Sequence, residues 1–253
     1  RCLEKSGSDL TVITQDGAIS LSAFLPIDQV AASGQAISTN IQNEFLASTR
    51  AYSTIFGWQS ILYPQGSYSL FNIPLSSTES VQYVVNSQTG AWCKFTGQNA
   101  ACWSLYNGDL YFGAQDGGVI YKADTGTSDN AADIDWKIRP SFSYYGSRGN
   151  KKIFSLCRPH FISSGVPSFA IDLNLDFSDI NPTNIPTPSE TASALWDVSK
   201  WDESYWAEEV TSAAWTTVFG MGECASPTIR GGTKTFSISF TAYDMIWQQG
   251  GAI

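Results

Sequence analysis

The stretch from Ser80 to Asp124 constrains the fold of this chain more than any other part. It reads SVQYVVNSQTGAWCKFTGQNAACWSLYNGDLYFGAQDGGVIYKAD, in which short apolar runs alternate with turn signals. Asn107-Gly108 and Asp116-Gly117 supply the positive φ angles that tight hairpin turns require. Short strands with aromatic and glycine punctuation are typical of β-propeller blades, although sandwiches and barrels share much of this pattern. The sequence therefore predicts an all-β, propeller-like meander.

The strands of two blades can be placed on this pattern. Four of them form a first blade: Trp58–Tyr63, Ser67–Ile73, Val81–Val85 and Ala91–Phe95. Three more begin a second blade: Cys102–Tyr106, Asp109–Ala114 and Val119–Lys122. Upstream, residues 9–24 read as a hairpin with a turn at Gln15-Asp16-Gly17. The strands that a complete blade needs do not precede this hairpin in the sequence. We therefore expect this chain to be the C-terminal part of a longer polypeptide.

One segment between the hairpin and the meander has helical rather than strand periodicity. Residues 36–52 read AISTNIQNEFLASTRAY, and Ile37, Ile41 and Phe45 recur every four positions. Polar residues, among them Ser48, are expected on the other faces of this inserted helix. Two interpretations stay open for the apolar stripe: packing over the edge of its own domain, or contact with a neighbouring subunit.

A second domain is expected after the meander. Residues 124–130, DTGTSDN, contain no apolar side chain and indicate a boundary, which gives domains at 1–124 and 133–253. The predicted strands then lengthen and suggest a sandwich or barrel-like fold. They are Trp136–Tyr145, Lys152–Phe161 with a hairpin tip at 146–150 before it, Phe169–Phe177, and a closing strand at Thr233–Thr241.

Composition excludes some functions. The 253 residues include 23 acidic and 14 basic side chains, a net charge of −9, and the basic residues are scattered. This argues against ordinary nucleic-acid binding, which depends on clustered Lys and Arg contacts to phosphates. Only 15% of residues are charged and 13% are aromatic, as in many stable extracellular or virion β proteins. No apolar run approaches the roughly 20 residues of a membrane-spanning helix.

The five cysteines form no C-x-x-C pair, and their odd number leaves at least one free thiol. Buried free thiols are the favoured interpretation, and they fit assembly in a reducing cytoplasm. A disulfide between Cys93 and Cys102, on neighbouring predicted strands, is the alternative.

Catalytic and metal-binding signals are weak, so we expect neither an enzyme nor a cofactor. The single histidine, His160, has no nucleophile motif that would make it part of a triad. Asp172 to Asp176 superficially matches the start of a calcium loop, but Phe177 stands where glycine is needed. Strand alternation is the simpler explanation, with Leu173, Leu175 and Phe177 facing a core.

Trp196, Trp201 and Trp206 form the most unusual pattern in the C-terminal half, because their spacing of five fits neither a helix nor a strand. They follow a proline-rich extended loop at 181–188. Tryptophans at this spacing usually anchor an irregular segment, and the alternative is an exposed ladder for a glycan or protein partner. The acids at 202–203 and 208–209 beside them keep a carbohydrate-cleaving site open as well.

Several strings resemble the packaged-DNA stabilisation or tail nozzle proteins of short-tailed, podovirus-like bacteriophages. They include Arg50-Ala51-Tyr52, Phe56-Gly57-Trp58-Gln59, Tyr63-Pro64-Gln65-Gly66, Gln82-Tyr83-Val84-Val85-Asn86, Thr89-Gly90-Ala91-Trp92-Cys93, Leu110-Tyr111-Phe112-Gly113, Tyr121-Lys122-Ala123-Asp124 and Leu195-Trp196-Asp197-Val198.

The resemblance implies a non-enzymatic virion protein in the phage tail, assembled in the bacterial host cytoplasm into a cyclic ring, a hexamer by family. It further implies a portal or adaptor partner, contacts with tail fibres or spikes, and passage of DNA without specific binding. Loops such as 113–118 and 181–188 are candidates for channel-facing or partner-facing elements. A carbohydrate-binding or carbohydrate-cleaving β protein of the phage tail or host exterior is the alternative function.

Overall fold

The computed structural model describes residues 2–25, 36–165, 167–182, 210–212 and 214–250. Antiparallel strands dominate, and α3 (Gln42–Tyr52) is the one α-helix longer than a single turn among these residues. The prediction of an all-β fold with an inserted helix is therefore confirmed, and none of the described sheets closes into a barrel. The chain divides into two compact units, Arg1–Thr125 and Gly126–Ile253. None of the described helices has the length and hydropathy needed to cross a bilayer.

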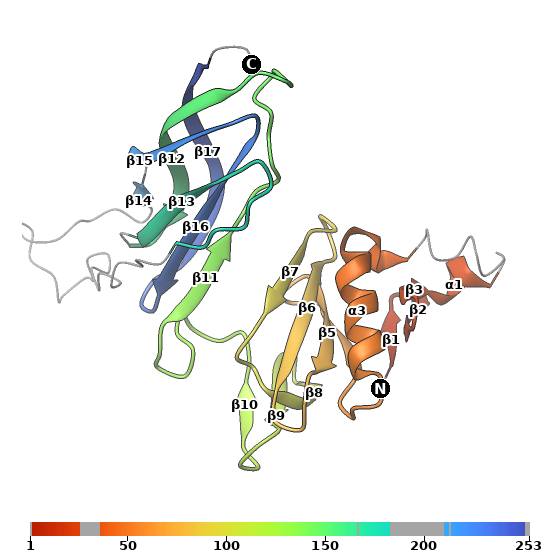
Figure 1. Ribbon diagram of the computed structural model, residues 1–253. Coiled ribbons are helices and arrows are strands. Elements are labelled where there is room, and N and C mark those ends of the chain that lie inside the picture. Colours follow the sequence, from red (N-terminus) through yellow and green to blue (C-terminus); the bar gives the residue numbers. More distant parts are fainter. Residues whose placement is uncertain (1, 26–35, 166, 183–209, 213, 251–253) are drawn as a thin grey trace, which may run out of the picture. The chain divides into compact units, whose positions relative to one another are not determined.

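The N-terminal unit begins with a small sheet and a helical segment (Figure 1). Its first three strands pair in the order β1-β2-β3. Their bounds are Leu3–Ser6, Asp9–Thr14 and Gly17–Ser20. A short helix α1 (Leu21–Phe24) follows β3, and a 3-10 turn η2 (Ile37–Ile41) leads directly into α3. The expected helix at 36–52 thus starts as 3-10 structure and becomes α-helical at Gln42.

Two consecutive antiparallel sheets form the rest of this unit. The first has the order β4-β5-β6-β7, and the second pairs β8 with β9 and β9 with β10. The first sheet contains Gln59–Tyr63, Tyr68–Pro74, Ser80–Asn86 and Trp92–Phe95. The second contains Ala100–Tyr106, Asp109–Ala114 and Ile120–Lys122. All seven strands lie within about two residues of their predicted positions. The prediction is accurate here because residues that favour tight turns mark the hairpins in the sequence.

Helix α3 packs on one face of the β4–β7 sheet, beside β5 and β6 (Figure 1). Phe45 is fully buried there, with ring centroids 6.2 Å from Phe71 and 6.1 Å from Tyr83. Ile41 packs against the same cluster, whereas Ile37 is 39% exposed. Packing within the unit therefore explains why Phe45 and Ile41 are apolar. Of the three residues, Ile37 is the one with enough exposed surface to contact another subunit.

Ser48 corrects the expectation that the polar residues of the helix avoid the sheet. It is buried, and its hydroxyl lies 2.9 Å from the Tyr83 hydroxyl. Tyr83 also donates to Glu44 Oε1 at 3.2 Å. A polar side chain can face the sheet here because the tyrosine at the helix contact carries its own hydrogen-bonding group.

The opposite face of the β4–β7 sheet packs against the second sheet. The shared cluster joins Tyr63, Leu70 and Val84 to Trp103 and Leu110. Consequently β5 and β6 are covered on both faces: every residue of the burial pattern in β6 from Ser80 to Val85 is buried. A sheet enclosed in this way must satisfy any polar side chain it contains by hydrogen bonds within the protein.

The β1–β3 sheet brings an unusual carboxyl group into this unit. Glu4, on β1, is only 6% exposed, and β1 packs beside β4. Ser69 Oγ donates a hydrogen bond of 3.0 Å to Glu4 Oε1, while the other oxygen, Oε2, is buried without a partner. Burial is the largest influence and outweighs hydrogen bonding to Ser69 and Ser60, so it raises the pKa of Glu4 to about 7.

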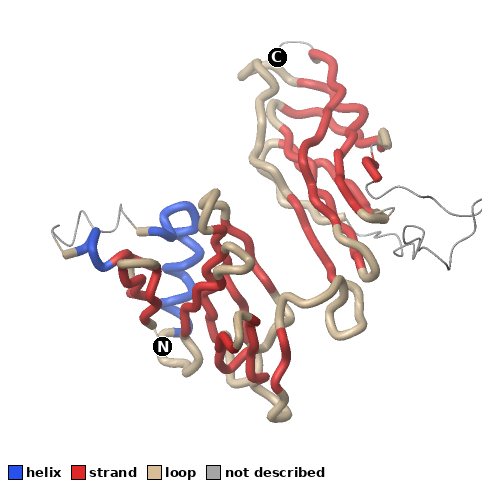
Figure 2. The backbone as a smooth tube through the Cα atoms, turned by 180° about the vertical axis from the view of Figure 1, so that it is seen from behind, coloured by secondary structure: helices blue, strands red, loops and turns tan. Residues whose placement is uncertain are grey.

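The C-terminal unit is a sandwich of two sheets whose inner faces share one core. One sheet has the order β11-β16-β13, with bounds Ile134–Ile138, Ala225–Thr233 and Ser168–Leu175. In the other, β12 (Lys152–Ser163) pairs with β17 (Ile238–Gln249) on one side. Its other side pairs with β15 (Thr216–Gly222) and β14 (Val210–Ser212). The tube in Figure 2 shows that strands make up most of this unit.

Two strand predictions in this unit are wrong. The strand expected at Trp136–Tyr145 ends at Ile138, since Pro140 interrupts the pairing, and β11 joins the sheet opposite to β12 rather than forming a hairpin with it. The strand expected at Thr233–Thr241 spans a reversal: β16 ends at Thr233 and β17 starts at Ile238. Phe236, in the turn, is nevertheless buried, which explains why its neighbourhood resembles a strand face.

A fully buried lysine fixes the start of β12. Lys152 Nζ donates to the backbone carbonyls of Ser147, Asn150 and Glu223 at 2.5, 3.0 and 2.9 Å. Three donors thus meet three acceptors, which offsets the cost of removing an ammonium group from water. The loop before β12 and the turn between β15 and β16 are thereby tied to one side chain.

Exchange of Glu4 for glutamine tests the buried carboxyl. Because the pKa of Glu4 is higher in the folded than in the unfolded chain, its contribution to stability is fully present below pH 4.5 and is lost as the pH rises through about 7. Glu4→Gln should therefore raise the free energy of unfolding of the N-terminal unit at pH 8, by up to about 3 kcal/mol, and have little effect at pH 4.5. Urea unfolding at both pH values measures this. The exposed Glu79→Gln is the control for net charge, and an equal gain in both variants would contradict the assignment.

Exchange of Lys152 for methionine tests the three-carbonyl contact. The variant keeps an unbranched side chain that is one atom shorter and leaves three carbonyls without their donor, so we expect a loss of about 3 kcal/mol in the stability of the C-terminal unit. Chemical unfolding followed by circular dichroism is the measurement. Lys151→Met, at the preceding position, is the matched control and should cost less than about 1 kcal/mol. Equal losses at the two positions would refute the role of Lys152.

Candidate functional site

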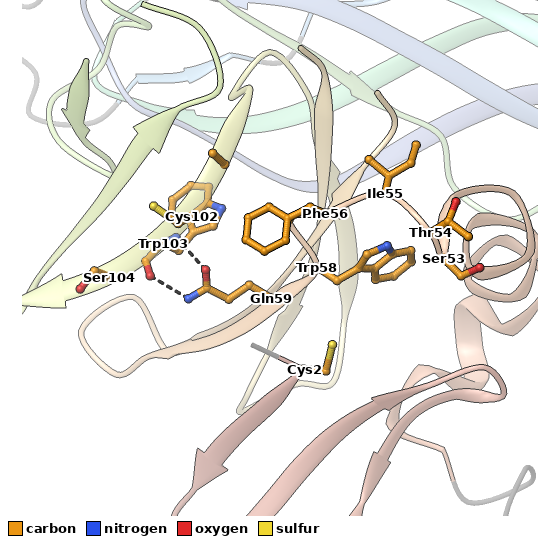
Figure 3. A pocket seen from close by; sticks show the side chains of 12 residues that line it. Cys2, Ser53, Thr54, Ile55, Phe56, Trp58, Gln59, Cys102, Trp103 and Ser104 are labelled. Atoms are coloured by element: carbon orange, nitrogen blue, oxygen red, sulfur yellow. Dashed lines mark hydrogen bonds between the residues drawn. The ribbon is translucent and has the colours of Figure 1, made fainter. Parts of the chain in front are cut away.

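An open groove of about 710 Å³ lies in the N-terminal unit. It is lined by Cys2, by the segment from Ser53 to Gln59 and by the β8 segment from Ala101 to Ser104. A smaller hollow of about 340 Å³ adjoins it and shares Cys2, Ser53 and Trp58. Figure 3 shows the ring of Phe56 in the middle of the groove's labelled side chains.

The connection from α3 to β4 places the aromatic residues of this groove. Helix α3 ends with the Ser53 N–H bonded to the Thr49 carbonyl, and Trp58 Nε1 donates to the Tyr52 carbonyl at 2.9 Å. Gly57 adopts a φ of 125°, a conformation that other residues rarely reach. This reversal leaves Phe56 92% exposed, so the chain holds a phenyl ring in solvent at a fixed point.

Gln59 joins the first sheet to the edge of the second. Its side-chain amide donates to the Trp103 carbonyl at 2.7 Å and accepts from the Trp103 N–H at 2.8 Å (Figure 3). The amide thereby acts as a substitute for one residue of a neighbouring strand. It fixes the spacing of β4 and β8 beside the groove, whose lining comes mainly from the connection into β4 and from β8.

A buried polar network supports the floor of the groove. Asn72 is fully buried and donates to the carbonyls of Gly57 and Ala100 at 2.8 and 3.1 Å. Its Oδ1 accepts from Trp103 Nε1 at 3.1 Å and from Gln82 Nε2 at 2.9 Å. One amide thus connects the helix-to-strand connection, two sheets and an indole, and low dielectric strengthens such a network when every member is paired.

The chemistry that the groove offers is neutral. Its lining residues carry no charge, and they present hydroxyl groups at Ser53, Thr54 and Ser104 beside the exposed ring of Phe56. Aromatic faces and hydroxyl groups can stack on and hydrogen-bond to an uncharged ligand or a peptide backbone. Of the titratable side chains that general acid–base catalysis uses, these lining residues supply only the thiols of Cys2 and Cys102.

His160 lies in the C-terminal unit, in a polar cluster on the outer face of β12 and β17. Arg158 Nη2 and Nε bond to Asp244 Oδ2 at 2.5 and 3.0 Å, and His160 Nε2 lies 2.9 Å from the same oxygen. The guanidinium also stacks on the Trp215 ring at 4.7 Å. His160, and then Arg158, hold the pKa of Asp244 below its usual range. The sequence alone indicates no partner for His160. The register of β12 with β17 brings Asp244 to it.

All five cysteines are free thiols, and the expectation that they are buried is right for only two of them. Cys157 and Cys224 are buried, and burial raises the pKa of Cys157 to about 12. Cys2, Cys93 and Cys102 are exposed, and Cys93 and Cys102 are not bonded to each other. Strand alternation explains the exposure of Cys102, because Trp103 takes the inward position next to it.

The calcium-like stretch is structural. Leu173 and Leu175 belong to the core of the sandwich, but Phe177 is 66% exposed, contrary to the expected alternation. The strand ends at Leu175, and both Asp176 and Phe177 adopt positive φ angles in a turn. Asp176 Oδ1 accepts the Glu223 N–H at 2.8 Å. Within the described ranges, no group of three or more His, Cys, Asp or Glu side chains is arranged to hold a metal ion.

Trp196, Trp201 and Trp206 lie outside the described residues, as do positions 183–188 of the proline-rich loop. The residues that line the groove were not predicted as a site. Phe56-Gly57-Trp58-Gln59 carries only a resemblance in the sequence, and no local pattern there predicts the exposure of Phe56.

A scan against protein-family models found no match, and a search of curated proteins also found none.

Exchange of Asn72 for leucine tests the network beneath the groove. The two side chains have the same branching, but leucine removes the acceptor of Trp103 Nε1 and the donor to the carbonyls of Gly57 and Ala100, so we expect a loss of about 3 kcal/mol in stability. The tryptophan fluorescence of the folded variant should also shift, because the environment of Trp103 changes. Asn43→Leu, on the exposed side of α3, is the control, with an expected change within about 0.5 kcal/mol. A neutral Asn72→Leu variant would argue against the network.

Proposed function

We propose that this chain is a structural, non-enzymatic component of the tail of a short-tailed bacteriophage. In this role it is one subunit of a cyclic nozzle ring that retains packaged DNA and lets it pass on infection. A portal or adaptor protein and tail fibres or spikes are its partners in the virion. The proposal begins from the strings that resemble the nozzle family and is supported by the way the chain folds around them.

The observation that carries the proposal is the arrangement of the β4–β7 and β8–β10 sheets. They are consecutive in sequence, antiparallel, and packed face to face through one cluster that includes Leu70, Trp103 and Leu110. Neighbouring blades of a propeller meet in the same way. The resembling strings at 56–59, 82–86 and 110–113 lie in or next to these two sheets.

Charge supports a channel role. The chain has a net charge of −9, and its 14 basic residues are distributed along the sequence rather than grouped. A wall that binds phosphates would slow a passing genome, because each neutralised phosphate adds to the affinity. An acidic wall repels the DNA backbone and a neutral wall does not attract it, so either allows rapid passage.

Electron microscopy of the native assembly tests the proposal. We expect closed rings of cyclic symmetry around an axial channel, attached to a phage tail, and no retention of duplex DNA by the isolated protein at about 50 mM salt. A dispersed protein that binds polysaccharide would overturn the nozzle assignment.

The groove favours one alternative, a carbohydrate-binding β protein of the phage tail or host exterior. An exposed Phe56 next to Ser53, Thr54 and Ser104 matches the combination of aromatic stacking and hydroxyl contacts that sugar rings require. Binding of a polysaccharide that Phe56→Ala weakens at least tenfold would favour this function. Equal binding by the variant and the wild-type protein would dismiss the groove as a glycan site.

A further inference from the structure

The outer face of the β12 sheet in the C-terminal unit carries an exposed apolar surface. In β15 the burial pattern alternates strictly, and the outward positions include Phe219 and Met221, which are 82% and 55% exposed. Gly220 and Gly222 take the inward positions. A side chain at Gly220 would meet Leu175 Cδ1 at 2.5 Å, so the core is closely packed at this inward position, while strand alternation places the larger residues outward.

Strand register makes this surface continuous. Met221 pairs with Ile153 of β12, which pairs on its other side with Gln248 of β17. Ile246 lies two residues before Gln248 and faces the same way, as Phe219 does relative to Met221. Ile153 and Ile246 are 37% and 42% exposed. We call the set the outer apolar face: Ile153, Trp215, Phe219, Met221 and Ile246.

The size of the outer apolar face is that of an interface rather than of scattered surface residues. Large side chains of this kind present roughly 200 Å² each when free, so the exposed fractions leave on the order of 500 Å² of apolar surface. This equals the largest patch of a typical monomer. Two copies that cover such faces together would bury on the order of 1,000 Å², the lower limit for a specific protein interface.

Charge on this face is already neutralised, although the chain as a whole is acidic. Asp244 is paired with Arg158 and His160, and Trp215 covers the guanidinium. Two copies with a net charge of −9 repel each other in general. A face whose single carboxylate is internally paired is therefore a favourable place for two copies to meet.

The edge of the same sheet is also open. Among the described strands, β17 pairs only with β12, and its sequence ISFTAYDMIWQQ contains one charged residue, Asp244, whose carboxylate is engaged on the face. Long edge strands without charges attract further strands unless something covers them. The open edge and the outer apolar face belong to the same sheet and adjoin each other at β17, which carries Ile246.

We infer that the outer apolar face, with the adjoining edge of β17, is an interface between copies of this chain. Its occupant is a second copy that buries Phe219 and Met221 near the centre and leaves the Arg158, His160 and Asp244 cluster at the rim. This inference does not rest on the phage-tail role, because it follows from the packing of the sandwich alone.

Sedimentation equilibrium of the full chain tests the inference with Phe219→Asp and Phe219→Thr. The wild-type protein should associate in the micromolar range, and both variants should weaken association at least tenfold, because each places a polar group at the centre of the buried area. Threonine keeps the strand propensity of the position, so its effect cannot be attributed to loss of the strand. Far-ultraviolet circular dichroism checks that each variant is folded.

Phe177→Asp is the matched control, since Phe177 is an exposed phenylalanine of the same unit outside this face. It should associate like the wild-type protein. The inference is overturned if the wild-type protein stays monomeric. A face that is covered by other parts of its own chain would give this result. Association that persists unchanged in both Phe219 variants overturns it as well, while leaving the nozzle proposal intact.

Discussion

The enclosure of the β4–β7 sheet on both faces is the constraint from which the N-terminal unit follows. Helix α3 covers one face through Phe45, and the β8–β10 sheet covers the other through Trp103 and Leu110. In a sheet without a solvent face, a polar side chain gains most when it is hydrogen-bonded within the protein. Asn72 and Gln82 are therefore both fully buried and mutually bonded, and their network also fixes the connection that exposes Phe56.

The groove is thus a product of the same packing rather than an independent addition. The Gln59 amide spans the gap between β4 and β8, and Asn72 binds the carbonyl of Gly57 beneath it. Both contacts use side-chain amides where a continuous sheet would use backbone groups. The unit can therefore hold two sheets against each other without merging them, which leaves an open, uncharged groove beside the connection into β4.

The C-terminal unit depends on the packing of two sheets around one core. Its two sheets share one core, and Lys152 ties the loops at one end through three carbonyls. Glycine at positions 220 and 222 lets the opposite sheet approach, while strand alternation places Phe219 and Met221 outward. Apolar residues on an outer face cost solubility unless they meet a partner, and this conflict is the basis for the proposed contact between copies.

The sequence by itself determined the strands and hairpins of the N-terminal unit, because turn residues such as Asn107-Gly108 and period-two alternation act over a few residues. Only the tertiary structure decided which sheets pair, which side of each strand is inward, and which charges are buried. The strands β11 and β12 are neighbours in sequence yet join different sheets, and β15 points its largest residues to solvent. Glu4 looks like a surface residue in the sequence but is enclosed by β4 and β5, since burial depends on contacts between distant segments that no local pattern encodes.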